Sequence, residues 1–318
     1  MIAKIIYKVK SQLLYHLSMK RKVDTHNDIK LGMTLLVKNE ADIIEMNINN
    51  HLNQGVDIIV ALDDNSTDRT PIILKNLADK GLLYLVDYPK TKYTHAGMVN
   101  YLGNIATSKY KADLIFHCDA DELWVSSTGN IKQEMINHPF VTGLHVPIIN
   151  VLLKEDNGHE KFPNDAIYHV VNPMKINNDS DKSMTDFFLQ EYPAKVLYTV
   201  RNGYLEVEQG NHEFVLSKNK KPIMVKSKDI TIFHFPIRGK QQFYAKILKA
   251  KHLIKKENPS GETSWHWKSW IKEFDEGNFN RLYKSLILSE KNAKILIDKK
   301  IVQVRVFREI NFGSLKKY

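Results

Sequence analysis

Short apolar runs and helix-like segments alternate along residues 29–125 of the chain. The apolar runs have the length of buried strands and cover residues 33–37, 56–62, 82–86 and 114–116. Apolar positions at helical spacing lie between them, in residues 41–53, 71–80 and 94–110. Strands that alternate with helices across short connections predict a mostly parallel sheet covered by helices on both faces. This part of the chain is therefore predicted to be an α/β domain.

The second half of the chain carries a weaker pattern. Strands are expected in residues 141–151, 194–200, 204–208 and 230–238, the last of them ending in a proline turn. Residues 154–190 are polar and irregular, which favours a loop. From residue 240 onward the spacing of apolar residues predicts helices. We therefore expect an N-terminal segment 1–28, a domain 29–238 with halves 29–125 and 126–238, and a mainly helical region 239–318.

The N-terminal segment is both basic and amphipathic. Its apolar residues between Ile2 and Leu17 fall on one helical face, and it lacks the apolar core and cleavage site of a signal peptide. Such a helix can lie on an anionic membrane surface or pack on the body of the protein, and the sequence leaves both open. No run of about 18 apolar residues predicts a membrane-spanning helix.

The charge and the cysteine content narrow the range of partners and compartments. A net charge of +10, from 46 Lys and Arg against 36 Asp and Glu, favours anionic partners such as phosphates and lipid head groups. No helix-turn-helix, zinc-finger or aromatic RNA-binding pattern accompanies it, so nucleic acid is not an expected partner. The single cysteine, Cys118, fits a reducing, cytoplasmic compartment, and its place in an apolar run predicts a buried structural thiol.

Three closely spaced carboxylates follow the apolar run that begins at Leu114, namely Asp119, Asp121 and Glu122. Open α/β sheets bind ligands just past the carboxyl ends of their strands. Two aspartates at positions i and i+2 of a turn can direct their oxygens at one cation, and Mg²⁺ and Mn²⁺ prefer oxygen ligands. An isolated Asp-x-Asp is more often a solvated turn, but its place after a strand here predicts a metal site.

Three motifs in order resemble the signature of a known family. They are Val37-Lys-Asn-Glu40, Asp63-Asp-Asn-Ser-Thr-Asp-Arg-Thr70 and Asp119-Ala-Asp-Glu122. Together they resemble family 2 glycosyltransferases with the GT-A fold, and the first strand is similar to a subgroup frequent in bacterial surface-polysaccharide and lipopolysaccharide gene sets. The resemblance is dense over residues 30–125 and continues weakly through 210–212 and 233–238. It implies a GT-A, Rossmann-like catalytic domain, in which residues 29–125 form the nucleotide-sugar half and 126–238 the acceptor half.

The resemblance also implies a nucleotide-binding function for residues near the first two strands. Asn39, Glu40 and Asp64 are expected to face the base and ribose of a nucleotide sugar. Asp63 is the alternative to Asp64, because the doubled aspartate leaves the register of the motif open.

The metal and diphosphate ligands follow from the same resemblance. Asp121 is expected to contact Mn²⁺ or Mg²⁺ directly, and Asp119 is expected to bind the metal or the donor ribose. A third metal ligand is expected from His234 or His212, because each follows a strand-like run within a segment similar to the family. Arg238 is expected to grip the diphosphate with its planar guanidinium.

The general base is the least defined part of the predicted site. An inverting transferase needs a carboxylate that takes the proton from the acceptor hydroxyl, and inversion itself is implied by the resemblance alone. The family's Glu-Asp pair at a helix start has no clear copy in this sequence. The candidates are Glu213, Asp186, Glu191 and Glu206, and Glu213 gains from its place in Gly-Asn-His-Glu.

These expectations describe a metal-dependent glycosyltransferase with a UDP-sugar as the expected donor and a glycan or lipid-linked acceptor. Two other classes remain open. One is a nucleotidyltransferase or phosphatase, although sugar nucleotidyltransferases usually carry a glycine-rich loop where this chain has Val37-Lys-Asn-Glu40. The other is a non-catalytic, membrane-associated scaffold that binds a nucleotide, and the intact Asp-x-Asp argues against it.

Overall fold

A computed structural model describes most of the chain, in two compact units. Described are residues 29–87, 94–156, 161–174, 186–200, 203–208, 210–214, 222–257 and 265–305. The expected helix in residues 1–28 lies outside the described residues. Among those described, the first unit contains the residues up to Ile148 together with Pro193–Ile232, and the second contains Ile149–Tyr192 and the residues from Phe233 onward. The domain boundaries expected from the sequence stay a prediction.

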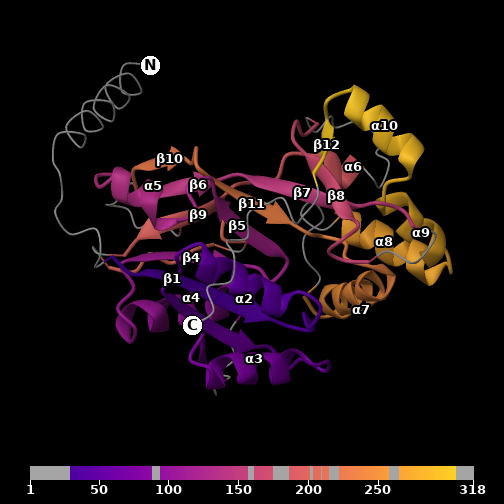
Figure 1. The fold of residues 1–318 in the computed structure, drawn as a ribbon. Helices are drawn as coiled ribbons and strands as arrows, with labels where there is room; N and C mark the ends of the chain where they lie inside the picture. The colour runs from indigo at the N-terminus through magenta and orange to yellow at the C-terminus, as the bar shows by residue number, and fades with distance from the viewer. Residues whose placement is uncertain are drawn as a thin grey trace. The chain divides into compact units, whose positions relative to one another are not determined.

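The first unit is built on a seven-stranded sheet (Figure 1). Its strands, in spatial order, are β10 (Met224–Lys226), β6 (Gly143–Val146), β9 (Lys195–Thr199), β4 (Leu114–Cys118), β1 (Leu31–Val37), β2 (Ile58–Asp63) and β3 (Tyr84–Leu85). Neighbouring strands run parallel except at β9, which is antiparallel to both β4 and β6. The mostly parallel α/β architecture predicted from the sequence is therefore confirmed.

The central strands are apolar because both faces of the sheet are covered. In β1, Leu31, Met33 and Leu35 lie on one face and Thr34 on the other, and all four are buried. Helix α4 (His95–Ser108) packs against β1, β2 and β4. Helix α2 (Ile44–Asn53) packs against α3 (Thr70–Asp79) and β5 (Glu122–Ser126), and α5 (Lys132–Asn137) follows β5. Burial of each large apolar side chain stabilises the fold by roughly 1.5–3 kcal/mol.

Several expected elements are wrong in the second half. Residues 141–151 form two strands, β6 and β7 (Ile148–Leu153), because Pro147 between them has no N–H for a sheet. Residues 204–208 contain no strand, only an isolated bridge from Val207 to Phe214. The expected loop 154–190 contains β8 (Ala166–Val170) and the short α6 (Asp186–Leu189). β5, β10 and β12 (Val302–Val304) were not predicted, because strands this short show no clear period.

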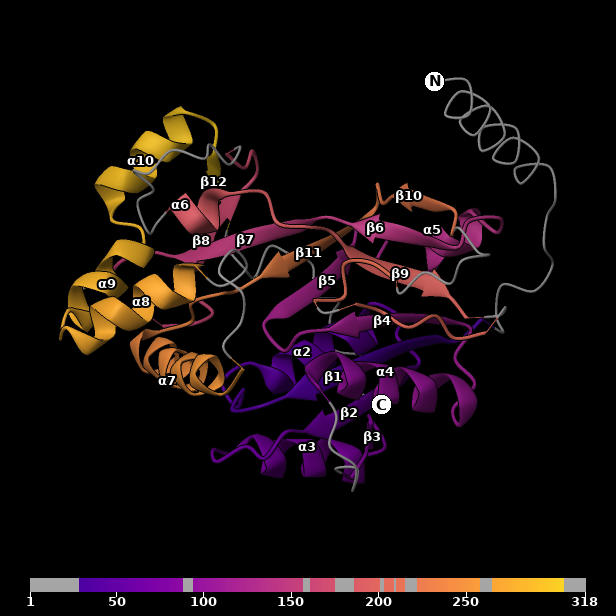
Figure 2. The same ribbon diagram turned by 180° about the vertical axis from the view of Figure 1, so that it is seen from behind.

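The second unit combines antiparallel strands with helices. β8 pairs antiparallel with both β7 and β12, and β11 (Ile230–His234) leads into this unit at Phe233. The helices are α7 (Lys240–Glu257), α8 (Trp265–Asp275), α9 (Phe279–Leu286) and α10 (Glu290–Asp298), of which α7, α8 and α9 lie side by side (Figure 2). Trp270 is buried among them and packs edge-on against Phe243. None of the helices described combines the length and the apolarity that a membrane crossing requires.

Candidate active site

The carboxyl ends of β1, β2 and β4 meet at one edge of the first unit's sheet, because β1 pairs in parallel with both neighbours. The chain runs from β1 outward to β2 and β3, and then returns to place β4 on the other side of β1. The strand order therefore reverses between β1 and β4, and open α/β sheets bind ligands beyond the strand ends at such a point. All three motifs of the predicted signature follow these three strands.

The Asp119-x-Asp121 motif forms the turn between β4 and β5. β4 ends at Cys118 and β5 begins at Glu122, and the Glu122 N–H donates to Asp119 O across the turn (3.1 Å). Ala120 and Glu122 are buried, whereas Asp119 and Asp121 are partly exposed. The structure thus brings the two predicted metal ligands together on one turn, with their side chains at the surface.

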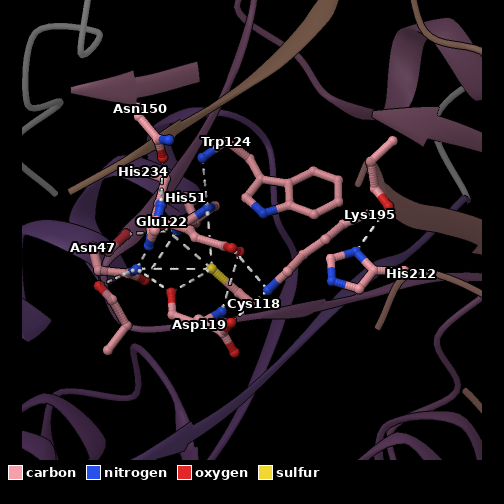
Figure 3. Close-up of polar contacts among 12 residues, drawn as sticks. Asn47, His51, Cys118, Asp119, Glu122, Trp124, Asn150, Lys195, His212 and His234 are labelled. Carbon is pink, nitrogen blue, oxygen red and sulfur yellow. Dashed lines mark hydrogen bonds and ion pairs between the residues drawn. The ribbon is translucent and has the colours of Figure 1, made fainter. Parts of the chain in front are cut away.

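A buried lysine, which the sequence did not predict as a site residue, holds this turn. Lys195 Nζ lies 2.6 Å from Asp119 Oδ2 and 2.8 Å from Glu122 Oε1 (Figure 3). The side chains of Lys195 and Glu122 are 3% and 4% exposed, and that of Asp119 is 48% exposed. The antiparallel register of β9 on β4 sets Lys195 opposite the end of β4. The sequence signal that could have identified Lys195 is a lysine inside an apolar strand, because a buried lysine needs a charged partner.

The three charges around Lys195 act on one another. Burial disfavours the charged lysine, but the carboxylates of Asp119 and Glu122 outweigh burial and raise the pKa of Lys195. Burial also disfavours charge on Asp119, yet Lys195 prevails and lowers the pKa of this carboxyl. Burial raises the pKa of Glu122, although Lys195 opposes this effect. Lys195 is therefore a permanent cation, and Asp119 its ionised partner at the surface.

Two buried histidines lie next to the turn and are held neutral. Burial lowers the pKa of His51 to about 4, although a hydrogen bond to Asn47 O opposes this effect. Burial and, after it, the charge of Lys195 lower the pKa of His117 to about 3. His117 Nδ1 lies 2.6 Å from Thr34 Oγ1, and its Nε2 lies 3.1 Å from the hydroxyl of Tyr198. Both imidazoles are therefore neutral in the folded protein near pH 7.

These two histidines predict that stability falls as the pH is lowered from 7 to 5. Between about pH 6.5 and their folded-state pKa values, the unfolded chain binds protons that the folded chain excludes, so acid favours unfolding. The loss at pH 5 is about 2 kcal/mol for each histidine, because one pKa unit corresponds to about 1.4 kcal/mol. Urea unfolding at both pH values measures it. Glutamine does not titrate, so in His51→Gln the pH dependence of the free energy of unfolding should correspond to about one proton fewer. An unchanged pH dependence in this variant contradicts the assignment of His51 as a buried neutral imidazole.

The loops after β1 and β2 are joined by hydrogen bonds through Asn39. Its backbone, at a φ of 58°, is left-handed, and its N–H donates to Ser66 Oγ (2.8 Å). The Thr67 N–H donates to Asn39 Oδ1 (2.7 Å), and the Glu40 N–H donates to Thr70 Oγ1 (2.8 Å). The structure therefore brings the first two motifs together, with Asn39 as the residue that links them.

The register of β2 places the doubled aspartate at the end of this strand. Asp63 is the last residue of β2 and pairs with Val37, and its Oδ2 accepts from the Ser66 N–H (3.0 Å). Its Oδ1 is buried and has no hydrogen-bond partner among the residues described. Asp64 lies one position further, 38% exposed, with Oδ2 3.5 Å from Lys38 Nζ. Asp63 thus shapes the turn, and Asp64 is the more accessible of the two carboxylates.

His212 belongs to the first unit and lies near the turn's charges. Its Nδ1 lies 3.0 Å from Ala194 O, which can only accept, so Nδ1 donates and Nε2 keeps a free lone pair when the ring is neutral. Burial lowers the pKa of His212, and smaller effects come from the Ala194 bond, Lys195 and Asp119. A Cβ on Gly210, at a φ of +88°, would lie 2.7 Å from the His212 ring, so glycine permits this conformation.

His234 and Arg238 belong to the second unit. Asn150 donates its amide to Phe188 O (2.9 Å), which leaves its Oδ1 as the acceptor for His234 Nδ1 at 2.7 Å. A neutral His234 therefore has its proton on Nδ1 and its lone pair on Nε2. Arg238 is buried, and its Nη1 donates to Phe235 O (3.5 Å). The roles of both residues toward metal and diphosphate stay predictions.

The candidate bases are dispersed between the units. Glu213 and Glu206 lie in the first unit and Glu191 in the second, and all three are exposed. Asp186 is the first residue of α6, and its side chain is outside the description. The identity of the base stays a prediction.

The donor atoms on the turn suit a hard divalent cation. Asp119 and Asp121 offer carboxylate oxygens, and Mg²⁺ usually takes one or two carboxylates while water and substrate phosphates fill its other positions. In the part of the chain that the structure describes, no three His, Cys, Asp or Glu side chains gather into a metal-binding group. The turn therefore offers two neighbouring carboxylates, Asp119 and Asp121, and His212 does not gather with them into a group of three.

A comparison with family models finds one match. Residues 35–128 match the model described as glycosyl transferase family 2. This segment contains all three motifs, together with the end of β1 and the whole of β2 and β4, and it is the family that the resemblance predicted. The match favours a glycosyltransferase over the nucleotidyltransferase, phosphatase and scaffold alternatives. No curated protein matches the chain.

Solved structures show only distant similarity. TarS 1–349 of S. aureus is 14% identical over 79% of this chain and 72% of its own, with a TM-score of 0.35. The structure of its complex with UDP-GlcNAc is 14% identical over 79% of this chain and 73% of its own, with a TM-score of 0.32. A third structure is glucosyl-3-phosphoglycerate synthase of Mycobacterium tuberculosis in complex with Mn²⁺, UDP and glucosyl-3-phosphoglycerate. It is 15% identical over 43% of this chain and 48% of its own, with a TM-score of 0.28. The similarity to the family therefore rests on the segment 35–128.

Proposed function

We propose that this glycosyltransferase moves a sugar from a nucleotide-diphosphate donor, with UDP as the expected nucleotide, and that the transfer depends on Mn²⁺ or Mg²⁺. The observation that carries the proposal is the Asp119-x-Asp121 turn at the carboxyl end of β4, where the strand order reverses. The two partly exposed carboxylates of this turn are suited to a cation that also binds a diphosphate.

Each side chain has a proposed task in this reaction. Departure of the nucleoside diphosphate builds negative charge, which a divalent cation would offset. Asp121 holds that cation. Asp119 either binds the same cation or binds the ribose of the donor. His212, through its free Nε2, is the third ligand that the first unit offers, and His234 is the alternative from the second. Arg238 is the proposed diphosphate contact.

The nucleotide is proposed to bind at the joined loops after β1 and β2. Asn39 and Glu40 line the end of β1, and Asp64 is the more accessible carboxylate for a base or ribose, whereas Asp63 shapes the turn. One of Glu213, Asp186 and Glu191 is the proposed base that deprotonates the acceptor, with inversion at the sugar.

The acceptor is proposed to be a glycan or a lipid-linked glycan, in bacterial surface-polysaccharide synthesis. A cytoplasmic location fits the single buried Cys118, whose thiol pKa is raised by burial. Binding to the inner face of the membrane depends on residues 1–28, which lie outside the described residues. Both the acceptor class and the membrane contact stay predictions.

Release of nucleoside diphosphate tests the proposed function. The full chain is incubated with UDP- and GDP-sugars, with Mn²⁺ or with a chelator, and the released nucleotide is measured. We expect slow hydrolytic release of UDP from one sugar nucleotide, stimulated by Mn²⁺, because water can replace an absent acceptor. Formation of UTP or GTP and a sugar 1-phosphate when pyrophosphate is added would instead indicate a nucleotidyltransferase, and nucleotide binding without any release would indicate a scaffold. Equal release with Mn²⁺ and with chelator contradicts the metal dependence.

A further inference from the structure

Helix α2 carries a buried polar face, which is unusual for a helix packed in the interior. Asn47, Asn50, His51 and Gln54 are at most 2% exposed. Asn50 and His51 follow Asn47 by three and four residues, and Gln54 follows them by four and three, so all four lie on one side of the helix and its C-cap. This side faces β5, against which α2 packs. Buried polar groups need hydrogen-bond partners, and here the partners lie on the backbone of β5.

The polar face of α2 binds the free edge of β5 residue by residue. Among the residues described, β5 is an edge strand, whose outer N–H and C=O groups have no neighbouring strand there. Asn50 donates to Trp124 O (3.1 Å), the Trp124 N–H donates to His51 Nε2 (3.2 Å), and the Ser126 N–H donates to Gln54 Oε1 (2.9 Å). A helical turn rises about 5.4 Å and two strand residues about 6.7 Å, so the two periods stay in step over this length.

Asn47 extends this pairing beyond β5 onto the Asp119-x-Asp121 turn. Its Nδ2 donates to Glu122 O at 2.8 Å and to Ala120 O at 3.0 Å, and Asp119 O lies at 3.3 Å (Figure 3). An amide has two hydrogens, so the two shorter bonds use both of them. One buried side chain therefore holds the carbonyls on either side of Asp121.

His51 fixes the direction in which the Asn47 amide points. Because the Trp124 N–H must donate to His51 Nε2, the proton of the neutral ring is on Nδ1. Nδ1 lies 2.8 Å from Asn47 O and 3.1 Å from Asn47 Oδ1, both acceptors. With Oδ1 directed at His51, the Nδ2 group of Asn47 has to face the turn. The sequence of bonds runs from the backbone of β5 through His51 to Asn47 and back to the turn.

We propose that Asn47 is the positioning residue of the Asp119-x-Asp121 turn, and that it sets the separation of the two carboxylates to suit a divalent cation and a nucleoside diphosphate. Neither aspartate gains a bond from Asn47 through its side chain, so the effect is on geometry alone. This inference rests on the proposed function of the turn. Groups that orient metal ligands typically change metal affinity by about 10- to 100-fold when they are removed.

Asn50 offers a matched control for Asn47. Both asparagines are buried on the same face of α2, and both donate to carbonyls of the segment that follows β4. Asn50 reaches only Trp124, in the middle of β5, whereas Asn47 reaches the turn itself. Replacement of each by leucine, of similar volume, removes the donors and keeps the packing. A merely structural role predicts similar behaviour of the two variants.

The experiment compares Asn47→Leu with Asn50→Leu in the full chain. Backbone hydrogen exchange without metal should accelerate over residues 119–122 in Asn47→Leu, and around residue 124 alone in Asn50→Leu. Titration calorimetry with UDP and Mn²⁺ should show affinity weaker by about tenfold or more for Asn47→Leu, and little changed for Asn50→Leu. Saturating Mn²⁺ should restore UDP binding to Asn47→Leu, because both aspartates remain. If the leucine variants do not fold, Asn47→Ser and Asn50→Ser replace them.

Two results separate this inference from the proposed function. If wild-type protein binds UDP equally with Mn²⁺ and with chelator, the proposed function fails, and hydrogen exchange alone decides whether Asn47 holds the turn. If wild-type binding depends on Mn²⁺ but Asn47→Leu matches Asn50→Leu in exchange and in affinity, Asn47 does not position the turn and the inference is overturned.

Discussion

We expect Asp121→Asn to reduce metal-stimulated donor turnover by about a hundredfold or more while the protein stays folded. Loss of one group that stabilises developing charge costs roughly 3 kcal/mol or more, and an amide is a much weaker ligand for a hard cation than a carboxylate. Asp121 is partly exposed on a turn, so the substitution leaves the core untouched. Release of UDP in the presence of Mn²⁺ measures turnover, and thermal unfolding measures the fold.

Asp79→Asn is the matched control for this loss. Asp79 ends α3, where its carboxylate pairs with Lys75 at 2.8 Å on the surface, and such exposed pairs contribute about 0–1 kcal/mol. This variant should keep both turnover and melting temperature. Calorimetric affinity of Asp121→Asn for UDP with Mn²⁺ that equals the wild-type value would falsify the assignment of Asp121 to the metal.

The α/β part of the fold was predictable because its signals are local. Runs such as 56–62 are long enough to show their apolar character, and the sheet buries them on both faces. The position of Asp119 and Asp121 follows from the same logic, since a polar residue just after a buried strand has to emerge at the edge of the sheet. One motif therefore fixed both the strand end and the candidate site.

The parts of the site that were missed depend on long-range pairing. Lys195 reaches Asp119 across 76 positions of sequence, and only the antiparallel register of β9 on β4 brings it there. No local pattern reveals that register, because β9 is the one strand of this sheet that runs against its neighbours. A buried lysine is recognisable in the sequence, but its partner is not.

The polar face of α2 was missed for a different reason. Polar residues at helical spacing ordinarily indicate a solvated face, and Asn47, His51 and Gln54 fit that pattern in the sequence. They are buried because β5 is an edge strand whose backbone needs partners. β5 itself was not predicted, since it starts at the carboxylate Glu122 and has only five residues. The polar face of α2 and the strand β5 were missed together, because the burial of this face is understood only once β5 is known to lie against it.

Lys195→Met is expected to destabilise the protein by about 3–5 kcal/mol, and more so at high pH. Removal of one partner of a buried ion pair leaves the other charge uncompensated, and Glu122 is almost fully buried. Without the lysine, burial and the negative charges of Asp119 and Asp121 act unopposed on Glu122 and raise its pKa further, so the folded variant binds a proton that the unfolded chain releases. The stability of Lys195→Met should therefore fall as pH rises above the unfolded-state value of Glu122.

The double variant Lys195→Met with Glu122→Gln separates charge from packing. It removes both buried charges at nearly constant volume, so it should recover much of the lost stability and abolish the added pH dependence. Asp119 stays half-exposed in both variants and can be solvated. Urea unfolding at pH 6 and pH 8 measures all three proteins. If Lys195→Met unfolds at the wild-type urea concentration at both pH values, Lys195 is not the counterion that holds the turn.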